Sequence, residues 1–344
     1  MTPADVTSTG TAAFVGSSLR IGTRASDLAL TQSGQVGEAL VAGTDHPVEL
    51  VHVSTHGDRD RTSPLAQIGG TGVFVTAVRQ ALLDGTVDVV VHSCKDLPTA
   101  PLEDITLACY PVREDPRDAL CARDGLTLAE LPAGAKVGTG SPRRAAQLLR
   151  ARPDLEVLGI RGNVETRLNR AQGPDADLDA VVLAASGLRR VGRDAAISEL
   201  LDASVMLPAP AQGALAVEAT TAALGQQPWF AQRLVAVDDP ATRAAITAER
   251  TLLATLEAGC SAPVAAYAEL ERADGEATGG VLRLRALAIR TDGSHVVEGE
   301  ARVALDLAED QLSGPGSVPA ELGAELAADL LSRGAGEILA EARA

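Results

Sequence analysis

Apolar runs that end in a turn and are followed by a helical pattern recur through residues 19–206, and this alternation restricts the fold more than any other feature. Residues 19–22, 48–53 and 87–91 read as strands. Helical spacing occupies residues 27–40 and 73–83. Strands that alternate with helices form mostly parallel sheets with helices on both faces. The sequence therefore predicts a doubly wound α/β architecture.

Arginines gather where later strands of this pattern end. The chain of 344 residues has a net charge of -16, yet residues 136–193 hold eleven Lys and Arg against six Asp and Glu. Arg144, Arg161 and Arg190 each lie shortly after an apolar run, close to the turn into the next helix. Open parallel sheets bind ligands at the carboxyl ends of their strands. This segment is therefore predicted to bind a small polyanion.

The segment Ser141-Pro142-Arg143-Arg144 gives the sharpest local argument. Ser141 is a good N-cap and Pro142 a good first helical residue, which places both arginines in the first turn. Cations at that end oppose the helix dipole. An anion held by free N–H groups and guanidinium groups would explain the pair. The alternative is a helix end whose arginines are simply solvated.

Two other residues stand out by position. Asp96 follows the strand at 87–91 and precedes Leu97-Pro98, so its carboxylate should lie at a fixed point of the cleft. It would suit a developing positive charge or an N–H group; the alternative is a structural aspartate paired with Lys95. Cys260 follows the end of a helix, where the dipole does not lower a thiol pKa, so an inert cysteine is the default interpretation.

Composition excludes several classes of function. Aromatic residues make up 2% of the chain, and together with the acidic charge this argues against nucleic-acid binding. No apolar run approaches the length of a membrane helix. Residues 1–16 resemble a disordered tail without the features of a signal peptide, so we expect a cytoplasmic protein with reduced cysteines. His52 and His56 would lie about 13 Å apart on a strand, so no metal site is expected.

The last third of the chain has a different pattern. Residues 207–213 are rich in Pro and Ala and read as a hinge, and residues 214–217 are expected to return as a strand to the first domain. Asp239 can N-cap a helix that begins at Pro240. Residues 282–289 alternate like a strand, Asp292-Gly293 is a hairpin signal, and 320–339 is helical. A smaller α+β domain is therefore predicted here.

Taken together, these segments resemble the hydroxymethylbilane synthase family, also called porphobilinogen deaminase, from about residue 19 to residue 340. The ordered motifs that carry the resemblance are Arg24-Ala25-Ser26, Thr55-His56-Gly57-Asp58, Gly70-Thr71-Gly72-Val73-Phe74, His92-Ser93-Cys94-Lys95-Asp96-Leu97-Pro98, Arg113-Glu114-Asp115-Pro116-Arg117-Asp118, Gly138-Thr139, Arg143-Arg144, Arg161-Gly162-Asn163, Gln212-Gly213 and Gly259-Cys260.

The resemblance implies two periplasmic-binding-protein-like α/β domains around a cleft plus the smaller α+β C-terminal domain. The implied division is a tail at 1–16, domain 1 at 17–113 and 212–235, domain 2 at 114–211, domain 3 at 236–344, and a mobile lid at 55–72.

The resemblance also implies a chemistry. A dipyrromethane cofactor would be attached by a thioether to Cys260, and Asp96 would be the catalytic carboxylate. Four porphobilinogens would be joined head to tail with loss of ammonia, and water would release linear hydroxymethylbilane for tetrapyrrole (haem, sirohaem, corrinoid) biosynthesis. The residues matched to binding of cofactor and substrate carboxylates are Arg24, Ser26, Ser93, Lys95, Thr139, Arg143, Arg144, Arg161, Arg167 and Arg190. Phe74 and Gln212 match cleft and hinge positions.

Some positions depart from the family. Gln67 and Thr71 stand where lysines are often found, Asp27 where proline is common and Ala211 where glycine is common. We expect a cytoplasmic monomer without metal; a transient hand-off of product to the next pathway enzyme is a further hypothesis. The competing hypothesis is a non-catalytic two-domain binding protein for a small polycarboxylate, which a covalent cofactor on Cys260 would exclude.

Overall fold

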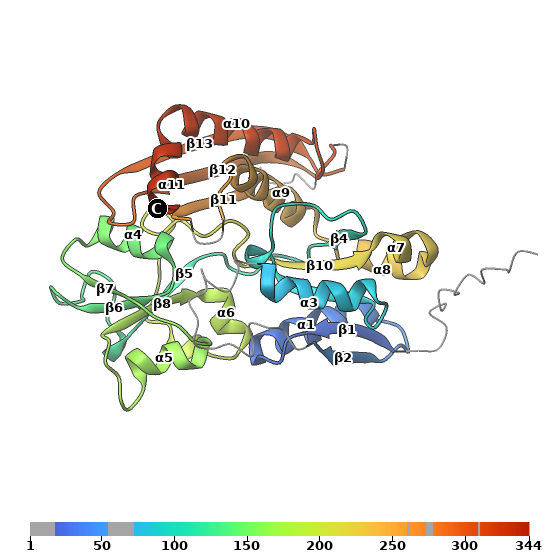
Figure 1. Ribbon diagram of the computed structural model, residues 1–344, viewed down its shortest axis with the longest axis horizontal. Coiled ribbons are helices and arrows are strands. Elements are labelled where there is room, and N and C mark those ends of the chain that lie inside the picture. The colour runs from blue at the N-terminus through green and yellow to red at the C-terminus, as the bar shows by residue number, and fades with distance from the viewer. Residues whose placement is uncertain (1–17, 54–71, 260–261, 273–277, 309, 344) are drawn as a thin grey trace, which may run out of the picture.

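The computed structural model describes residues 18–53, 72–259, 262–272, 278–308 and 310–343. These form three sheets, each with its own helices (Figure 1). The tail at 1–16, the lid apart from Gly72, and Cys260 lie outside the described residues.

The first sheet is mixed. Its elements are β1 (Leu19–Thr23), α1 (Asp27–Val41), β2 (Val48–His52), α3 (Gly72–Leu83), β3 (Val89–Ser93), the 3-10 turn η1 (Cys94–Asp96), β4 (Ile105–Cys109), β10 (Leu215–Thr220), α7 (Thr221–Gln226) and α8 (Pro228–Val237). The strand order is β2-β1-β3-β10-β4, with β1, β2 and β3 parallel and β10 antiparallel to both of its neighbours. The strand expected to return after the hinge therefore does return, as β10.

The second sheet repeats this arrangement. Its elements are β5 (Asp118–Ala122), η2 (Arg123–Gly125), β6 (Lys136–Thr139), α4 (Pro142–Ala151), β7 (Glu156–Gly159), α5 (Val164–Gln172), β8 (Ala180–Ala184), α6 (Ala185–Arg190), η3 (Asp194–Ala196) and β9 (Glu199–Leu200). The order is β7-β6-β8-β5-β9, and β6, β7 and β8 are parallel neighbours. The three arginine-bearing strand ends therefore meet at one edge, as the sequence predicted.

Both sheets carry apolar cores on their two faces. In the first, Val36 of α1 packs in a cluster with Ile21, whereas Val78 of α3 packs with Val90. In the second, α4 and α5 contribute to separate clusters in the same way. Alternating apolar residues of buried strands point to opposite faces, and each face needs a helix to cover it. The doubly wound prediction is confirmed.

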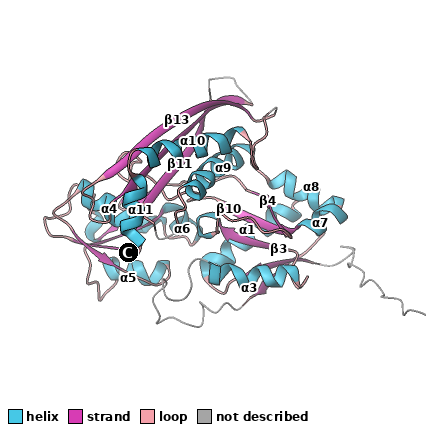
Figure 2. Cartoon of the chain, turned by 45° about the horizontal axis from the view of Figure 1, so that its top comes forward, coloured by secondary structure: helices cyan, strands magenta, loops and turns pink. Residues whose placement is uncertain are grey.

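The third sheet is an antiparallel meander. Its elements are α9 (Pro240–Thr255), β11 (Val264–Glu271), β12 (Gly279–Ile289), β13 (Val296–Asp306), α10 (Val318–Ser332) and α11 (Ala335–Arg343). Helices α9 and α10 pack together beside it (Figure 2). Asp239 caps α9 as predicted, since its side chain accepts a hydrogen bond from the Thr242 N–H. The helical stretch expected at 320–339 is two helices, separated where Gly334 has a φ of +100°.

Helix α4 connects the second and third domains. Its Ala146 shares a small buried cluster with Leu207 of the hinge and with Leu287 and Ile289 of β12. The α+β domain therefore packs directly on the helix that carries Arg143 and Arg144. Two doubly wound α/β domains with the same order of strands and a small α+β domain confirm the predicted fold class.

Candidate active site

A cavity of about 530 Å³ lies where the three domains meet. It is lined by residues of the first sheet and α1, by the start of α4, by the hinge and by the loop after α9. The predicted site residues that line it are Arg24, Ser26, Ser93, Lys95, Asp96, Arg143, Arg144 and Gln212. Gly259 and Ala262, which flank the predicted attachment cysteine in the sequence, line it as well.

Asp96 is the last residue of η1, immediately after β3, and its side chain is exposed to the cavity. The turn is held at both ends. The Cys94 N–H donates to the Ala214 carbonyl at 3.0 Å, and Leu97 is 2% exposed in a core cluster. Arg250 of α9 donates to the carbonyls of Leu97 and Pro98, at 3.1 and 2.7 Å. The fixed position predicted for this carboxylate is therefore supplied partly by the third domain.

Lys95 lies beside Asp96 and faces the second domain. Its Nζ donates to the Gln212 Oε1 at 3.3 Å. Burial and the nearby Arg144 guanidinium lower the pKa of Lys95 to about 8, although Asp96 and Asp118 act in the opposite direction. A lysine with such a pKa changes its charge near neutral pH.

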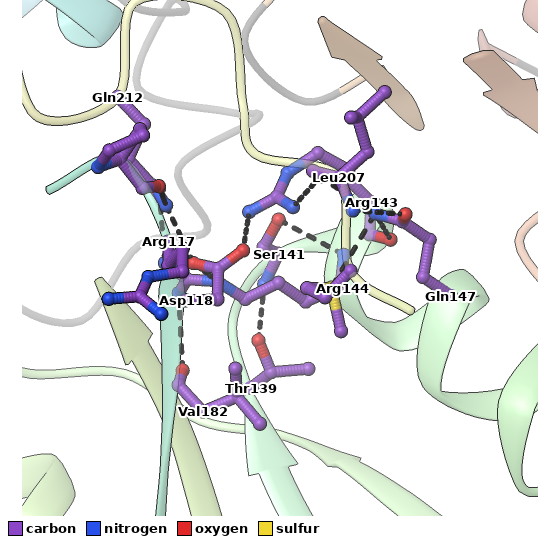
Figure 3. A network of polar contacts seen from close by, with 12 residues as sticks. Arg117, Asp118, Thr139, Ser141, Arg143, Arg144, Gln147, Val182, Leu207 and Gln212 are labelled. Atoms are coloured by element: carbon purple, nitrogen blue, oxygen red, sulfur yellow. Dashed lines mark hydrogen bonds and ion pairs between the residues drawn. The ribbon is translucent and has the colours of Figure 1, made fainter. Parts of the chain in front are cut away.

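Arg143 and Arg144 are 3% and 6% exposed, so the alternative of a solvated helix end is wrong. Ser141 and Pro142 start α4 as predicted. The anion that faces the arginines is a residue of the protein, Asp118 at the start of β5 (Figure 3). The Arg143 Nη2 donates to the Asp118 Oδ2 at 2.7 Å, and the Arg144 Nε donates to Oδ1 at 2.9 Å.

This buried cluster includes the hinge. Gln212 is 0% exposed, and its Nε2 donates to the Asp118 Oδ1 at 2.8 Å and to the Pro116 carbonyl at 2.7 Å. Burial alone would raise the pKa of Asp118, but the Arg143 and Arg144 guanidiniums and the Gln212 amide bring it down to about 2. Asp118 is therefore a charged buried residue, which sequence reasoning quoted in a motif without assigning it a role.

The hydroxyl groups near the cavity have local partners. Ser26 caps α1, with its Oγ accepting from the Ala29 N–H at 3.4 Å. Ser93, the last residue of β3, shares a hydrogen bond of 3.1 Å with the Gln32 side-chain amide. Thr139 is buried, and its Oγ1 accepts from the Ser141 N–H at 3.2 Å. Thr139 therefore shapes the start of α4 and does not line the cavity.

The remaining predicted residues lie around the cavity rather than on its wall. Arg161 is exposed at the turn after β7. Burial and the nearby Arg144 guanidinium lower the pKa of Arg167 of α5, whereas Asp96 acts in the opposite direction. Arg190 donates to the Gly213 carbonyl at 2.6 Å and lines a second hollow. Phe74 belongs to the first turn of α3, and its side chain is outside the described part of the chain.

A second buried carboxylate was also missed from the sequence. Glu249 of α9 is 0% exposed and accepts from Arg113 at 2.6 and 3.1 Å. It also accepts from the backbone N–H of Ala211 at 2.5 Å and of Ala268 at 2.7 Å. Ala211 has a φ of +62°, in the region that glycine adopts most easily, which accounts for the glycine common there in the family. Glu249 thus joins the third domain to the hinge at Ala211 and to Arg113 in the segment before β5.

Within the described residues, no helix is long and apolar enough to cross a membrane. The same part of the chain shows no group of three or more His, Cys, Asp or Glu side chains arranged to hold a metal ion.

Comparison with known proteins agrees with the geometry. Residues 19–225 match the family described as porphobilinogen deaminase, dipyromethane cofactor binding domain, and residues 243–332 match the porphobilinogen deaminase C-terminal domain. The porphobilinogen deaminase of Thermobifida fusca is 52% identical over 325 residues, covering 94% of this chain and 97% of the relative. Porphobilinogen deaminase 1 of Streptomyces coelicolor is also 52% identical, covering 94% and 98%.

Solved structures are similar only at a distance. A Candida albicans protein with the generic periplasmic binding protein fold is 12% identical, with a TM-score of 0.35, and the match covers 64% of this chain and 69% of that one. The sequence matches extend over both α/β domains and the third domain and reach about half identity. The chain therefore belongs to the porphobilinogen deaminase family.

Proposed function

We propose that the cavity at the junction of the three domains is the active site, with Asp96 as its catalytic carboxylate and Cys260 as the attachment point of the cofactor. The observation that carries this proposal is the position of Asp96 on a rigid turn, in the same cavity as Lys95, Arg143 and Arg144. Gly259 and Ala262 support the second assignment, because they line that cavity on either side of Cys260 in the sequence.

The activity is that of the family. The protein is a hydroxymethylbilane synthase, a transferase of tetrapyrrole biosynthesis that joins four porphobilinogens with release of ammonia and then releases linear hydroxymethylbilane by hydrolysis. It uses a dipyrromethane cofactor. A purely solute-binding role is not favoured.

The residues present fit this cofactor. A cavity of about 530 Å³ is of ordinary size for a small-molecule site. A dipyrromethane carries two carboxylates on each ring, and the cavity wall offers four basic side chains: Arg24, Lys95, Arg143 and Arg144. When bound, the cofactor supplies the pyrrole carbon to which the first substrate is joined.

In this proposal the basic side chains bind and orient carboxylates, while Asp96 acts at the reacting atoms. Loss of ammonia from the aminomethyl group leaves positive charge on the substrate pyrrole. A carboxylate held beside that charge stabilises it without reorganising, because the turn is already fixed. Asp96 also accepts a hydrogen bond from a pyrrole N–H, and it is placed to hold or move a proton.

Intact mass measurement tests the attachment site. The protein purified from cells that make porphobilinogen should be heavier than its sequence by one dipyrromethane, and Cys260→Ser should remove the increment. Cys109→Ser is the matched control, because Cys109 is buried in β4, does not line the cavity, and has a pKa raised by burial to about 12. An increment that survives Cys260→Ser would refute the assignment of Cys260.

Asp96→Asn tests the catalytic assignment. The variant should keep substrate binding and lose turnover by about a hundredfold or more, since preorganised electrostatic groups contribute on that scale. A steady-state assay of ammonia release measures it. Near-normal kcat would contradict the role of Asp96.

We also propose a domain division, a lid, an oligomeric state, a location and further carboxylate-binding roles. The division into 17–113 with 212–235, 114–211 and 236–344 is supported by the three separate sheets. A cytoplasmic location and the absence of metal rest on composition and residue spacing. A lid at 55–72, a monomeric enzyme and a hand-off of product to the next enzyme rest on the family resemblance. So do the carboxylate-binding roles of Ser26, Ser93, Thr139, Arg161, Arg167 and Arg190.

A further inference from the structure

Asp118 lies directly behind the basic wall of the cavity. Its side chain is 0% exposed, whereas Arg143 and Arg144, which it contacts, line the cavity. The carboxylate accepts from three side chains at once: Arg143 at 2.7 Å, Arg144 at 2.9 Å and Gln212 at 2.8 Å. It therefore acts on any ligand only through these neighbours.

The placement of this carboxylate is rigid. Asp118 is the first residue of β5 and pairs with Ala184 of β8 in the sheet. A second nitrogen of each guanidinium is also hydrogen-bonded. Arg143 Nη1 donates to the Leu207 carbonyl at 2.6 Å, and Arg144 Nη1 donates to the Val182 carbonyl at 3.1 Å. Figure 3 shows Asp118 between the two guanidinium groups. Each guanidinium is thus fixed between a backbone carbonyl and one shared carboxylate.

The charges of this cluster do not cancel. Two guanidiniums face one carboxylate, which leaves one positive charge in a nearly dry site. The Nε of Arg143 is buried and has no hydrogen-bond partner among the described residues. Burial lowers the pKa of Arg143, and Asp118 opposes that effect. An uncompensated buried charge is costly. The remaining positive charge of this cluster is therefore neutralised only when an anion binds against Arg143 and Arg144.

Gln212 extends the cluster to the catalytic turn. Its Nε2 donates to Asp118, while its Oε1 accepts from Lys95 at 3.3 Å and from Arg144 at 3.4 Å. The position of Asp118 therefore determines where the arginines of the second domain lie relative to the Lys95–Asp96 turn of the first. Among the described residues, no other side chain is seen to accept hydrogen bonds from Arg143, Arg144 and Gln212 together.

We propose that Asp118 is a positioning residue for carboxylate recognition: it orients the guanidiniums of Arg143 and Arg144 and leaves this wall one net positive charge, enough for one ligand carboxylate. This inference rests on the proposed function of the cavity. It assigns Asp118 no contact with the reacting atoms.

Asp118→Asn removes the charge at constant shape and places an amide N–H₂ against an N–H donor of one arginine. The fraction of protein that carries the cofactor, measured by intact mass, should fall to less than half that of the parent protein. In the loaded fraction, KM for porphobilinogen should rise about tenfold or more, with kcat within a few-fold. Glu298→Gln is the control, since Glu298 of β13 forms an exposed ion pair with Arg150 of α4, the helix that also carries Arg143 and Arg144.

Asp118→Glu keeps the negative charge and tests the geometry if the asparagine variant does not fold. Its extra methylene shifts the carboxylate, so KM should rise at least about fivefold with kcat near that of the parent. An unchanged KM and loaded fraction in either folded variant would overturn the proposal, as would a loss confined to kcat. Failure of the proposed function is recognised separately, because the parent protein would then show neither a mass increment nor turnover.

Discussion

Glu249→Gln gives a large stability change whose size can be worked out from the structure. The Glu249 carboxylate is 0% exposed, and its partner Arg113 has a side chain only 10% exposed. Four donors point at its two oxygens: two from Arg113 and the backbone N–H groups of Ala211 and Ala268. An amide replaces one oxygen with an N–H₂ group, so two donors at that position meet a third donor instead of an acceptor.

Breaking a buried ion pair by removing one charge costs about 3 to 5 kcal/mol. For a chain of this size, 1 kcal/mol corresponds to about 2 °C in the unfolding midpoint. Glu249→Gln should therefore unfold at least about 6 °C below the parent protein in a circular dichroism melt at a fixed scan rate. Glu298→Gln should change the midpoint by about 2 °C or less, because its pair with Arg150 is half exposed. Equal midpoints for the two variants would refute the assignment of Glu249 as a buried structural anion.

Two further changes have equally direct consequences. Gly213→Ala should destabilise the protein by about 2 kcal/mol or more, because Gly213 has a φ of +89° and a Cβ there would lie 2.3 Å from the Glu114 carbonyl oxygen. Gly225→Ala is the control, because a Cβ at Gly225 would meet no atom within 4 Å. Similar urea midpoints for the two variants would contradict this reasoning. In the parent enzyme, KM for porphobilinogen should rise as the pH is raised through about 8, since Lys95 is charged below its lowered pKa and neutral above it. Lys95→Arg should remove that rise, because a guanidinium stays charged; an identical pH profile of KM for both proteins would exclude Lys95 as the titrating group.

Local sequence patterns were sufficient to predict structure where a residue's role depends on its neighbours in the chain. The N-caps at Ser141 and Asp239 and the return of a strand after the hinge appear in the structure as predicted. The helical region at 320–339 was predicted in kind, but its break at Gly334 was not, since a single glycine in an apolar helical pattern is an ambiguous signal.

The sequence by itself determined that this is an α/β chain whose arginine-bearing strand ends lie at one sheet edge, and that Asp96 occupies a fixed point after a neighbouring buried strand. It determined this because parallel strands place their carboxyl ends together, whatever the details of packing. Only the tertiary structure decided what those arginines face. Asp118 lies 25 residues from Arg143, and Glu249 lies 136 residues from its partner Arg113. Local spacing in the sequence cannot predict a contact across such a separation. These distant ion pairs are buried beside the cavity and fix the positions of its neighbouring segments. An unpaired charge that is removed from water is costly, so each buried carboxylate is paired with an arginine within the fold.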